Sequence, residues 1–339
     1  MKKNPKAFGE NILATVVNLF SKHFFVSPKF LMKVLPMLRL EIPNLPFFFG
    51  IHKHGVSHPD AECILHAAEA SGKIERSEFK EKGQFLWSEP RIKYKLYSNL
   101  SLAEMDATAK QLGVTLPQLE RKVEVLANKY GGNPEYIEES TIKYLINKFR
   151  QPTAWLYFSG RWEIKQSSLQ YKGLRQFTIG PVSVPIPDFV VELMPLQRLI
   201  FEVYVPLLAK KDEPNSERYF RINALKKAGR EGNLSGEKVF LFGYILNIPK
   251  KLEDRTERFQ CTMSDSWFFS NRDRRINLIL DGSARASFER DLKDFTKYEI
   301  MVLGTMANDH VNVSAILKIA ELPKRKRDSI VTLKDFLVA

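Results

Sequence analysis

The residues best suited to chemistry lie together in the last third of the sequence, where three aromatic residues precede three arginines: Trp267, Phe268, Phe269, Arg272, Arg274 and Arg275. Aromatic rings stack on nucleic-acid bases, and guanidinium groups pair with phosphate oxygens. Three consecutive aromatic residues in a loop cannot all face one core, so at least one is expected to be exposed or packed on another domain. The segment predicts a base-stacking site. In the alternative interpretation, the rings cap a core and the arginines pair with Asp265 and Asp273.

A second cluster consists of histidines. Four of the six histidines fall within fifteen residues, and one cysteine lies among them: His52, His54, His58, Cys63 and His66. These are ligand types for zinc, but a catalytic metal centre needs further ligands downstream, where only His310 remains. The pattern fits loop histidines near a helix start better than a metal site. No metal or other cofactor is predicted, although a hydrolase built on His52, His54 and His58 stays open as a third hypothesis.

Several motifs of catalytic proteins are missing from the sequence. There is no phosphate-binding loop of the G-x-x-x-x-G-K-[ST] type, no strand-associated G-x-G-x-x-G and no G-x-S-x-G elbow. Neighbouring carboxylates such as Glu138 and Glu139 have lysines nearby and are typical of a solvated helix face. We therefore expect a protein that is not an enzyme.

The composition indicates a folded protein with an excess of positive charge. The 339 residues include 52 Lys and Arg against 39 Asp and Glu, a net charge of +13. The excess is concentrated in residues 1–100 (15 basic, 9 acidic) and in the tail 323–339 (5 basic, 2 acidic). Such charge favours attraction to phosphate. The run at 323–327 also resembles a nuclear-import signal, and this alternative stays open.

The same composition excludes some classes of protein. Cys63 and Cys261 are the only cysteines, so a disulfide scaffold is excluded. No apolar run approaches the roughly 18 residues of a membrane span, and we expect a cytoplasmic protein with no membrane partner.

Residues 101–150 form the clearest helical block. Ser101 with Glu104 and Thr115 with Gln118 have the spacing of capping boxes, and Gly113 lies between the two predicted helices. Residues 102–126 resemble a helix-turn-helix hairpin. The resemblance implies that the second helix offers two basic side chains to a DNA groove: Arg121 and Lys122.

One departure from the helix-turn-helix pattern keeps other interpretations open. An apolar residue is expected thirteen positions after Ala109, but Lys122 stands there and Val123 follows one position late. A helical hairpin used for packing and a winged-helix protein-interaction module are therefore alternatives to a duplex reader.

The C-terminal segment alternates strand and helix signals in a specific order. Strands are predicted at 239–248, 258–263 and 275–280, a helix at 284–295, and further strands at 298–305 and 311–320. With Gly243 in the first strand, the turn at Asp281 and Gly282, and the late strand 298–304 ending in glycine, residues 238–322 resemble an OB-fold module of the kind that binds single-stranded nucleic acid.

The resemblance implies a binding groove over the second and third strands and their loops. Besides the aromatic and arginine residues of the loop, it adds six candidates: Tyr244, Lys250, Lys251, Arg255, Arg258 and Phe259. The net charge of this segment is only +1 (13 basic, 12 acidic), so the basic N-terminal region and tail are expected to contribute to phosphate attraction.

Together these signals predict an α+β protein that ends in a five-stranded OB-type β-barrel. We expect five regions: a basic mixed region (1–100), the helix-turn-helix-like block (101–150), an aromatic-rich β segment (151–230), the barrel (238–322) and a basic tail (323–339). The leading hypothesis is a non-catalytic nucleic-acid-binding protein that favours single-stranded DNA. It would assist replication, repair or element mobility beside other proteins of that machinery. Alternatives are an RNA- or tRNA-binding factor and an assembly subunit whose barrel docks another protein.

Overall fold

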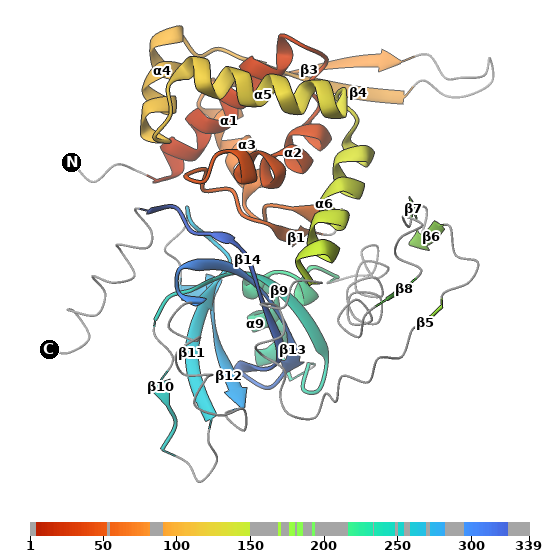
Figure 1. The fold of residues 1–339 in the computed structure, drawn as a ribbon, viewed down its shortest axis with the longest axis vertical. Coiled ribbons are helices and arrows are strands. Elements are labelled where there is room, and N and C mark those ends of the chain that lie inside the picture. Colours follow the sequence, from red (N-terminus) through yellow and green to blue (C-terminus); the bar gives the residue numbers. More distant parts are fainter. Residues whose placement is uncertain are drawn as a thin grey trace, which may run out of the picture. The chain divides into compact units, whose positions relative to one another are not determined.

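The computed structural model describes thirteen stretches of the chain: residues 5–52, 55–81, 91–149, 169–170, 176–179, 182–185, 192–193, 216–232, 234–247, 250–253, 258–268, 272–281 and 295–324. These residues fold as a mixed α and β protein (Figure 1). The chain divides into two compact units. Unit 1 comprises Met1–Phe47, Asp60–Glu138 and Trp267–Phe269, and unit 2 comprises Phe48–Pro59, Glu139–Ser266 and Ser270–Ala339.

Three helices open unit 1: α1 (Pro5–Ser21), α2 (Pro28–Glu41) and α3 (Ala61–Ala70). Apolar residues four positions apart, such as Ile12 and Val16 in α1, are buried because this spacing lies on one helix face. Ser27 caps α2 by accepting a hydrogen bond from Phe30 N, and Pro28 stands in the first turn, where its missing N–H costs nothing. The Ser-Pro pair therefore marks the start of this helix.

The helical block continues with α4 (Leu102–Gln111), α5 (Leu116–Tyr130) and α6 (Pro134–Phe149). α6 begins in unit 1, and its residues from Glu139 onward belong to unit 2. Both predicted capping boxes are present: Ser101 with Glu104, and Thr115 with Gln118. Gly113 has φ +77°, a left-handed conformation that glycine adopts without the steric cost of a Cβ atom. The helical hairpin that the sequence predicted is confirmed as a local structure.

Unit 1 also contains a two-stranded antiparallel ribbon, β3 (Ile74–Glu81) with β4 (Arg91–Ser98). It extends away from the neighbouring helices (Figure 1). Apolar and polar residues alternate along β4, a pattern typical of a strand with one face turned to solvent. Residues 82–90 lie outside the described residues. The strand at 74–81 was not predicted, because its charged residues hide the alternation.

Unit 2 contains several short elements before its main sheet. Two are pairs of antiparallel strands, β1 (Gly50–His52) with β2 (Gly55–Ser57) and β6 (Gln176–Ile179) with β7 (Val182–Pro185). β5 (Leu169–Gln170) pairs with β8 (Glu192–Leu193), and a short 3₁₀ turn, η5 (Ser216–Tyr219), precedes helix α9 (Ile222–Arg230).

The main sheet has six strands: β9 (Lys238–Ile245), β10 (Lys250–Lys251), β11 (Arg258–Ser264), β12 (Arg275–Asp281), β13 (Tyr298–Met306) and β14 (His310–Glu321). Their order is β10-β11-β12-β14-β13-β9, and β11 pairs with β9 as well, so the pairing returns to the first strand. β12 and β14 are parallel, and all other neighbours are antiparallel. The five strands predicted for this segment are all present. The helix predicted at 284–295 lies outside the described residues except for its last residue.

The core of the main sheet is built from alternate residues of its strands and from one face of α9. Cys261 is fully buried there, and burial raises the pKa of its thiol to about 12, so it is not a nucleophile at neutral pH. Ile222 and Leu225 of α9 belong to the same core. α9 therefore belongs with the sheet, although the sequence placed it in a preceding region that ends at 230.

β9 is buried on both of its faces. Leu241 and Ile245 point into the core, whereas Tyr244 lies on the opposite side, where its ring centroid is 5.7 Å from that of Phe48. Phe48 in turn lies 5.9 Å from the ring of His58. Phe48, with His58 behind it, thus covers the outer side of β9 at Tyr244, which helps to explain why this strand is apolar at nearly every position.

No helix within the described stretches is long and apolar enough to cross a membrane.

Gly243 allows the close approach of β9 to β11. A Cβ atom at this position would lie 2.0 Å from the backbone oxygen of Ser264. We predict that Gly243→Ala lowers the free energy of unfolding by about 3 kcal/mol, because the two strands must separate to accept the methyl group. Urea unfolding followed by circular dichroism measures this change.

Gly232→Ala is the matched control. Gly232 has φ +79°, and a methyl group added to its Cα would meet no atom within 4 Å, so only the backbone cost of about 1 kcal/mol is expected. Equal effects of the two substitutions would show that close strand approach is not the constraint at Gly243.

Candidate nucleic-acid interface

The outer surface of β11 and β12 presents polar side chains in register. Along β11, Phe259, Cys261 and Met263 are buried in the core, while Arg258, Gln260 and Thr262 between them are partly exposed. Gln260 is opposite Ile279 of β12, and Thr262 is opposite Asn277. This surface therefore combines amide, hydroxyl and guanidinium groups on rigid strands.

The short strand β10 extends this surface. Lys250 is opposite Gln260 and Lys251 is opposite Phe259, and both lysines are exposed. The chain on either side is anchored to β11: Leu252 N donates to Arg258 O at 2.8 Å, and Asn247 Oδ1 accepts from Thr262 N at 2.6 Å. The lysines predicted to contribute from the first hairpin thus lie at the solvent-exposed edge of the sheet.

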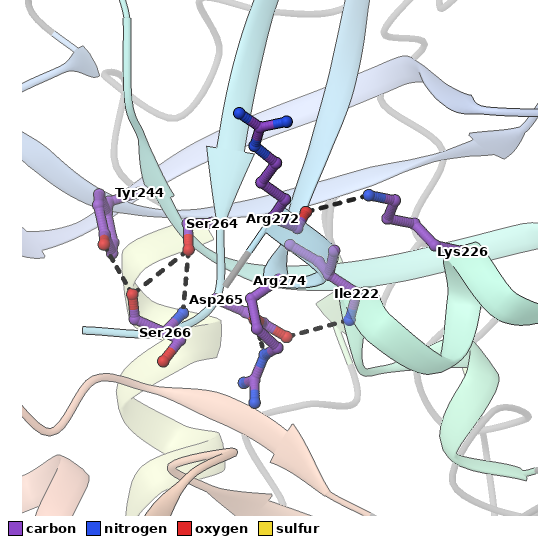
Figure 2. A network of polar contacts seen from close by, with 8 residues as sticks. All are labelled: Ile222, Lys226, Tyr244, Ser264, Asp265, Ser266, Arg272 and Arg274. Atoms are coloured by element: carbon purple, nitrogen blue, oxygen red, sulfur yellow. Dashed lines mark hydrogen bonds and ion pairs between the residues drawn. The ribbon is translucent and has the colours of Figure 1, made fainter. Parts of the chain in front are cut away.

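A buried carboxylate organises the chain between β11 and β12. Asp265 Oδ1 lies 2.6 Å from Arg274 Nε, and its Oδ2 accepts a hydrogen bond from Ile222 N at 3.0 Å (Figure 2). The Tyr244 hydroxyl donates to Ser266 O at 2.7 Å. Since Arg221 provides no side-chain cap for α9, Asp265 performs that role from a distant part of the chain.

This network leaves a group of cations at the surface. The short 3₁₀ turn η6 (Arg272–Arg274) follows the loop, and the Arg272 side chain extends away from Asp265 (Figure 2). The Lys226 ammonium donates to Arg272 O at 3.0 Å, which ties α9 to the turn. We call the exposed and partly exposed cations of these elements the α9–η6 patch: Lys226, Lys227, Arg230, Arg272 and Arg275.

Sequence reasoning missed the contribution of α9 to this patch. Its signal was present, because apolar residues recur at 222, 225 and 228 while basic residues occupy 226, 227 and 230. This spacing is typical of a helix with one buried and one cationic face. The glycine and charge content of residues 228–236 instead suggested a linker.

The structure buries four of the residues predicted to contact a ligand. Three rings have less than a tenth of their surface exposed, and the fourth residue is a buried arginine: Tyr244, Phe259, Phe268 and Arg274. Phe259 belongs to the core, and Phe268 lies 5.1 Å from the ring of Phe47 within unit 1. Arg274 pairs with Asp265, as the alternative interpretation expected. Burial keeps all four side chains from stacking on a base.

The other predicted contacts have different environments. Trp267 is half-buried, Arg258 is partly exposed, and Arg272 and Arg275 are exposed. Phe269 and Arg255 lie outside the described residues.

Arg121 and Lys122 lie on α5 in unit 1. Arg121 is exposed, and the Lys122 ammonium lies 3.9 Å from a Glu41 carboxylate oxygen. Val123 is fully buried, so the apolar residue that stands one position late still fills the helical core. The hairpin therefore has a complete apolar core without the expected spacing. Contact of Arg121 and Lys122 with duplex DNA stays a prediction.

The histidine cluster does not gather around one point in the described part of the chain. His58 is buried in unit 2, whereas Cys63 and His66 are exposed on α3, with His66 beside Glu69 at 3.3 Å. No group of three or more metal-ligand side chains occurs among the described residues. His54 lies outside them.

Comparison with known proteins adds no family. No family model, no curated protein and no solved structure matches this chain. Its function therefore has to be argued from the residues and their arrangement.

We predict that Asp265→Asn destabilises unit 2 by roughly 3–5 kcal/mol. The substitution removes the charge of the carboxylate whose Oδ1 lies 2.6 Å from the buried Arg274 Nε, and it weakens the cap of α9. Asp273→Asn is the control, because Asp273 is exposed and lies 3.6 Å from Arg230, an arrangement worth less than about 1 kcal/mol. Chemical unfolding of both variants tests this difference. Equal losses of unfolding free energy would contradict the proposed structural role of Asp265.

His58 gives a pH prediction. Burial first, and then the positive charges of Arg274 and Arg221, hold the pKa of His58 well below its usual value. The unfolded chain takes up a proton near pH 6.5 while folded His58 does not, so stability falls as the pH drops from about 7 to 5.

The measurement is the free energy of unfolding in urea at pH 7.5, 6.5 and 5.5. In His58→Gln the unfolding free energy should fall less steeply with decreasing pH, by about 1 kcal/mol per pH unit below pH 6.5, because one titrating group is removed. His66→Gln, on the exposed side of α3, should leave the decline unchanged. An equally steep decline in His58→Gln would contradict the prediction.

Proposed function

We propose that this protein is a non-catalytic nucleic-acid-binding protein that holds single strands, DNA in the first instance, on the outer surface of β11 and β12. Under this proposal it acts beside other proteins in replication, repair or element mobility. The observation that carries the proposal is the register of exposed polar and basic side chains over β10, β11 and β12, continued by the α9–η6 patch.

We also infer that residues 238–322 form an OB-type barrel. The cyclic pairing of β9, β11, β12, β14 and β13, and the parallel pairing of β12 with β14, support this inference. In such a barrel the second and third strands form the ligand surface. Those strands correspond to β11 and β12.

The chemistry of this surface favours hydrogen bonds and phosphate contacts over stacking on aromatic rings. Gln260 and Asn277 can donate to and accept from base edges. Arg258 and Arg275 can pair with phosphate or lay their planar guanidinium groups on unpaired bases. With Tyr244 and Phe259 buried, the arginines take over the stacking role that the sequence assigned to the rings.

Cations on α9 and η6 compensate for the low net charge of residues 238–322. Affinity for a polyanion depends on the phosphates that are neutralised locally, so a patch contributes even where the whole segment is nearly neutral. Lys226 and Lys227 precede residue 238, so the net charge of +1 for residues 238–322 does not include them.

The test is fluorescence-anisotropy titration with a labelled thirty-base DNA single strand and the matching duplex across a salt series. Arg258→Gln/Arg275→Gln removes two phosphate contacts, and the slope of log K against log salt on single strands should become shallower by about 1.4. Lys110→Gln, on the exposed face of α4 beside Asp106, is the control and should leave the slope unchanged.

Two further arms decide between ligands and sites. Arg121→Gln/Lys122→Gln should not change single-strand affinity, whereas a selective loss of duplex affinity would assign duplex reading to α5. Competition by an unlabelled RNA of the same sequence distinguishes DNA from RNA. Binding that is equal for single strand and duplex and disappears at moderate salt would overturn the proposal in favour of a protein-docking surface.

A further inference from the structure

The β3–β4 ribbon of unit 1 carries an unusual share of exposed rings. Seven large hydrophobic side chains are more than a third exposed in the described part of the chain, and four of them belong to this ribbon: Phe79, Ile92, Tyr94 and Tyr97. Strand register places Phe79 and Tyr97 on one face of the ribbon and Ile92 and Tyr94 on the other. Exposed apolar side chains gathered on one element generally mark an interaction surface, because isolated exposure is common but clustering is not. None of these residues belongs to the surface proposed above.

The base of the ribbon is rigidly anchored while its far half is exposed. Ile74 and Leu96 are buried, and Leu96 N donates to Val26 O at 3.0 Å. On the other strand, Arg76 Nε donates to Glu69 Oε1 at 2.7 Å. Because an isolated two-stranded ribbon is only marginally stable, these anchors hold the exposed half in position.

One face of the ribbon brings rings and lysines together, along with Glu75, which is directly opposite Tyr97. Strand periodicity places Lys93, Lys95 and Tyr97 of β4 on the same side, and Phe79 of β3 is directly opposite Lys93. The Phe79 ring meets Phe25 edge to face at 4.8 Å, and the Lys95 ammonium lies 4.6 Å from the Tyr97 ring centroid. We call these side chains the ribbon face: Phe25, Phe79, Lys93, Lys95 and Tyr97.

The charge of the ribbon favours an anionic partner. Its two strands contain five basic residues, Arg76, Lys80, Arg91, Lys93 and Lys95, against three acidic residues, Glu75, Glu78 and Glu81. All three acidic residues belong to β3, so β4 carries basic residues alone among its charged side chains. A polyanion that also has flat apolar surfaces therefore fits better than a purely apolar partner.

Single-stranded nucleic acid has both properties. Its bases are free to stack on aromatic rings, and its phosphates attract the lysines between them. Bases in a duplex are stacked on one another, so exposed rings such as Phe79 and Tyr97 gain little from a duplex. We propose that the ribbon face is a second single-strand-binding platform, in unit 1, whose rings stack on unpaired bases. This inference rests on the proposed function and adds a separate surface to it.

The decisive experiment uses the full chain and the same labelled thirty-base single strand and duplex. Phe79→Ala/Tyr97→Ala should weaken single-strand binding by about tenfold or more, since each stacked base contributes about 1–3 kcal/mol and about 1.4 kcal/mol is tenfold. Duplex binding should change less than about twofold. Phe79→Tyr/Tyr97→Phe retains both rings and should bind single strands like the unmodified protein.

Lys93→Gln/Lys95→Gln keeps both aromatic rings and gives a second readout, the salt dependence of binding. The salt slope for single strands should become shallower by about 1.4, as expected for two lost phosphate contacts. Leu102→Ala/Lys110→Gln removes an exposed apolar side chain and an exposed cation elsewhere in unit 1, and should leave affinity and slope unchanged. Circular dichroism checks that each variant is folded.

The outcomes separate this inference from the proposed function. Unchanged single-strand binding in both ribbon variants, with a loss in Arg258→Gln/Arg275→Gln, overturns the platform and leaves the proposed function standing. A loss in the ribbon variants alone supports the platform and overturns the β11–β12 surface. If the ribbon variants lose equal affinity for single strand and duplex, stacking of the rings on unpaired bases is overturned, and the ribbon would instead contact a groove of the duplex. No binding by the unmodified protein would overturn both, and the ribbon would then be a protein-docking surface.

Discussion

The main sheet depends on one buried carboxylate. Asp265 receives the guanidinium of Arg274 and the first backbone N–H of α9, so a single side chain joins the end of β11, the turn η6 and the helix that completes the core. Burying a carboxylate is costly unless it is paired and hydrogen-bonded, and here both conditions are met. By holding Arg274 inward, the same pair determines which neighbouring arginines remain at the surface.

The second constraint is the covering of β9 by residues 48–59. Phe48 packs against Tyr244 and His58 packs against Phe48, so the Tyr244 ring is enclosed. What remains exposed over β11 and β12 is a set of amide, hydroxyl and guanidinium groups. Under the proposed function, β11 and β12 would therefore bind a ligand through polar and cationic groups.

Among the described residues, the large apolar side chains that are more than a third exposed lie in unit 1. The ribbon face combines rings with lysines on a two-stranded element whose base is buried. The sequence contains the same kinds of residue at 91–98 and at 267–275, yet their burial is opposite: Tyr97 is exposed and Phe268 is enclosed. Composition alone does not distinguish a binding strand from a packing loop, because both use aromatic and basic residues.

The sequence by itself determined the elements whose causes are local. The capping boxes at Ser101 and Thr115, the left-handed Gly113, and the five strands of residues 238–322 were all predicted, since each depends on residues within a few positions of one another. The tertiary structure decided which side chains face solvent. Asp265 contacts a backbone N–H 43 residues away, and Tyr244 is covered by a segment near residue 48. Such contacts form only when distant parts of the chain meet, and no local pattern specifies which of several similar rings or arginines will be enclosed.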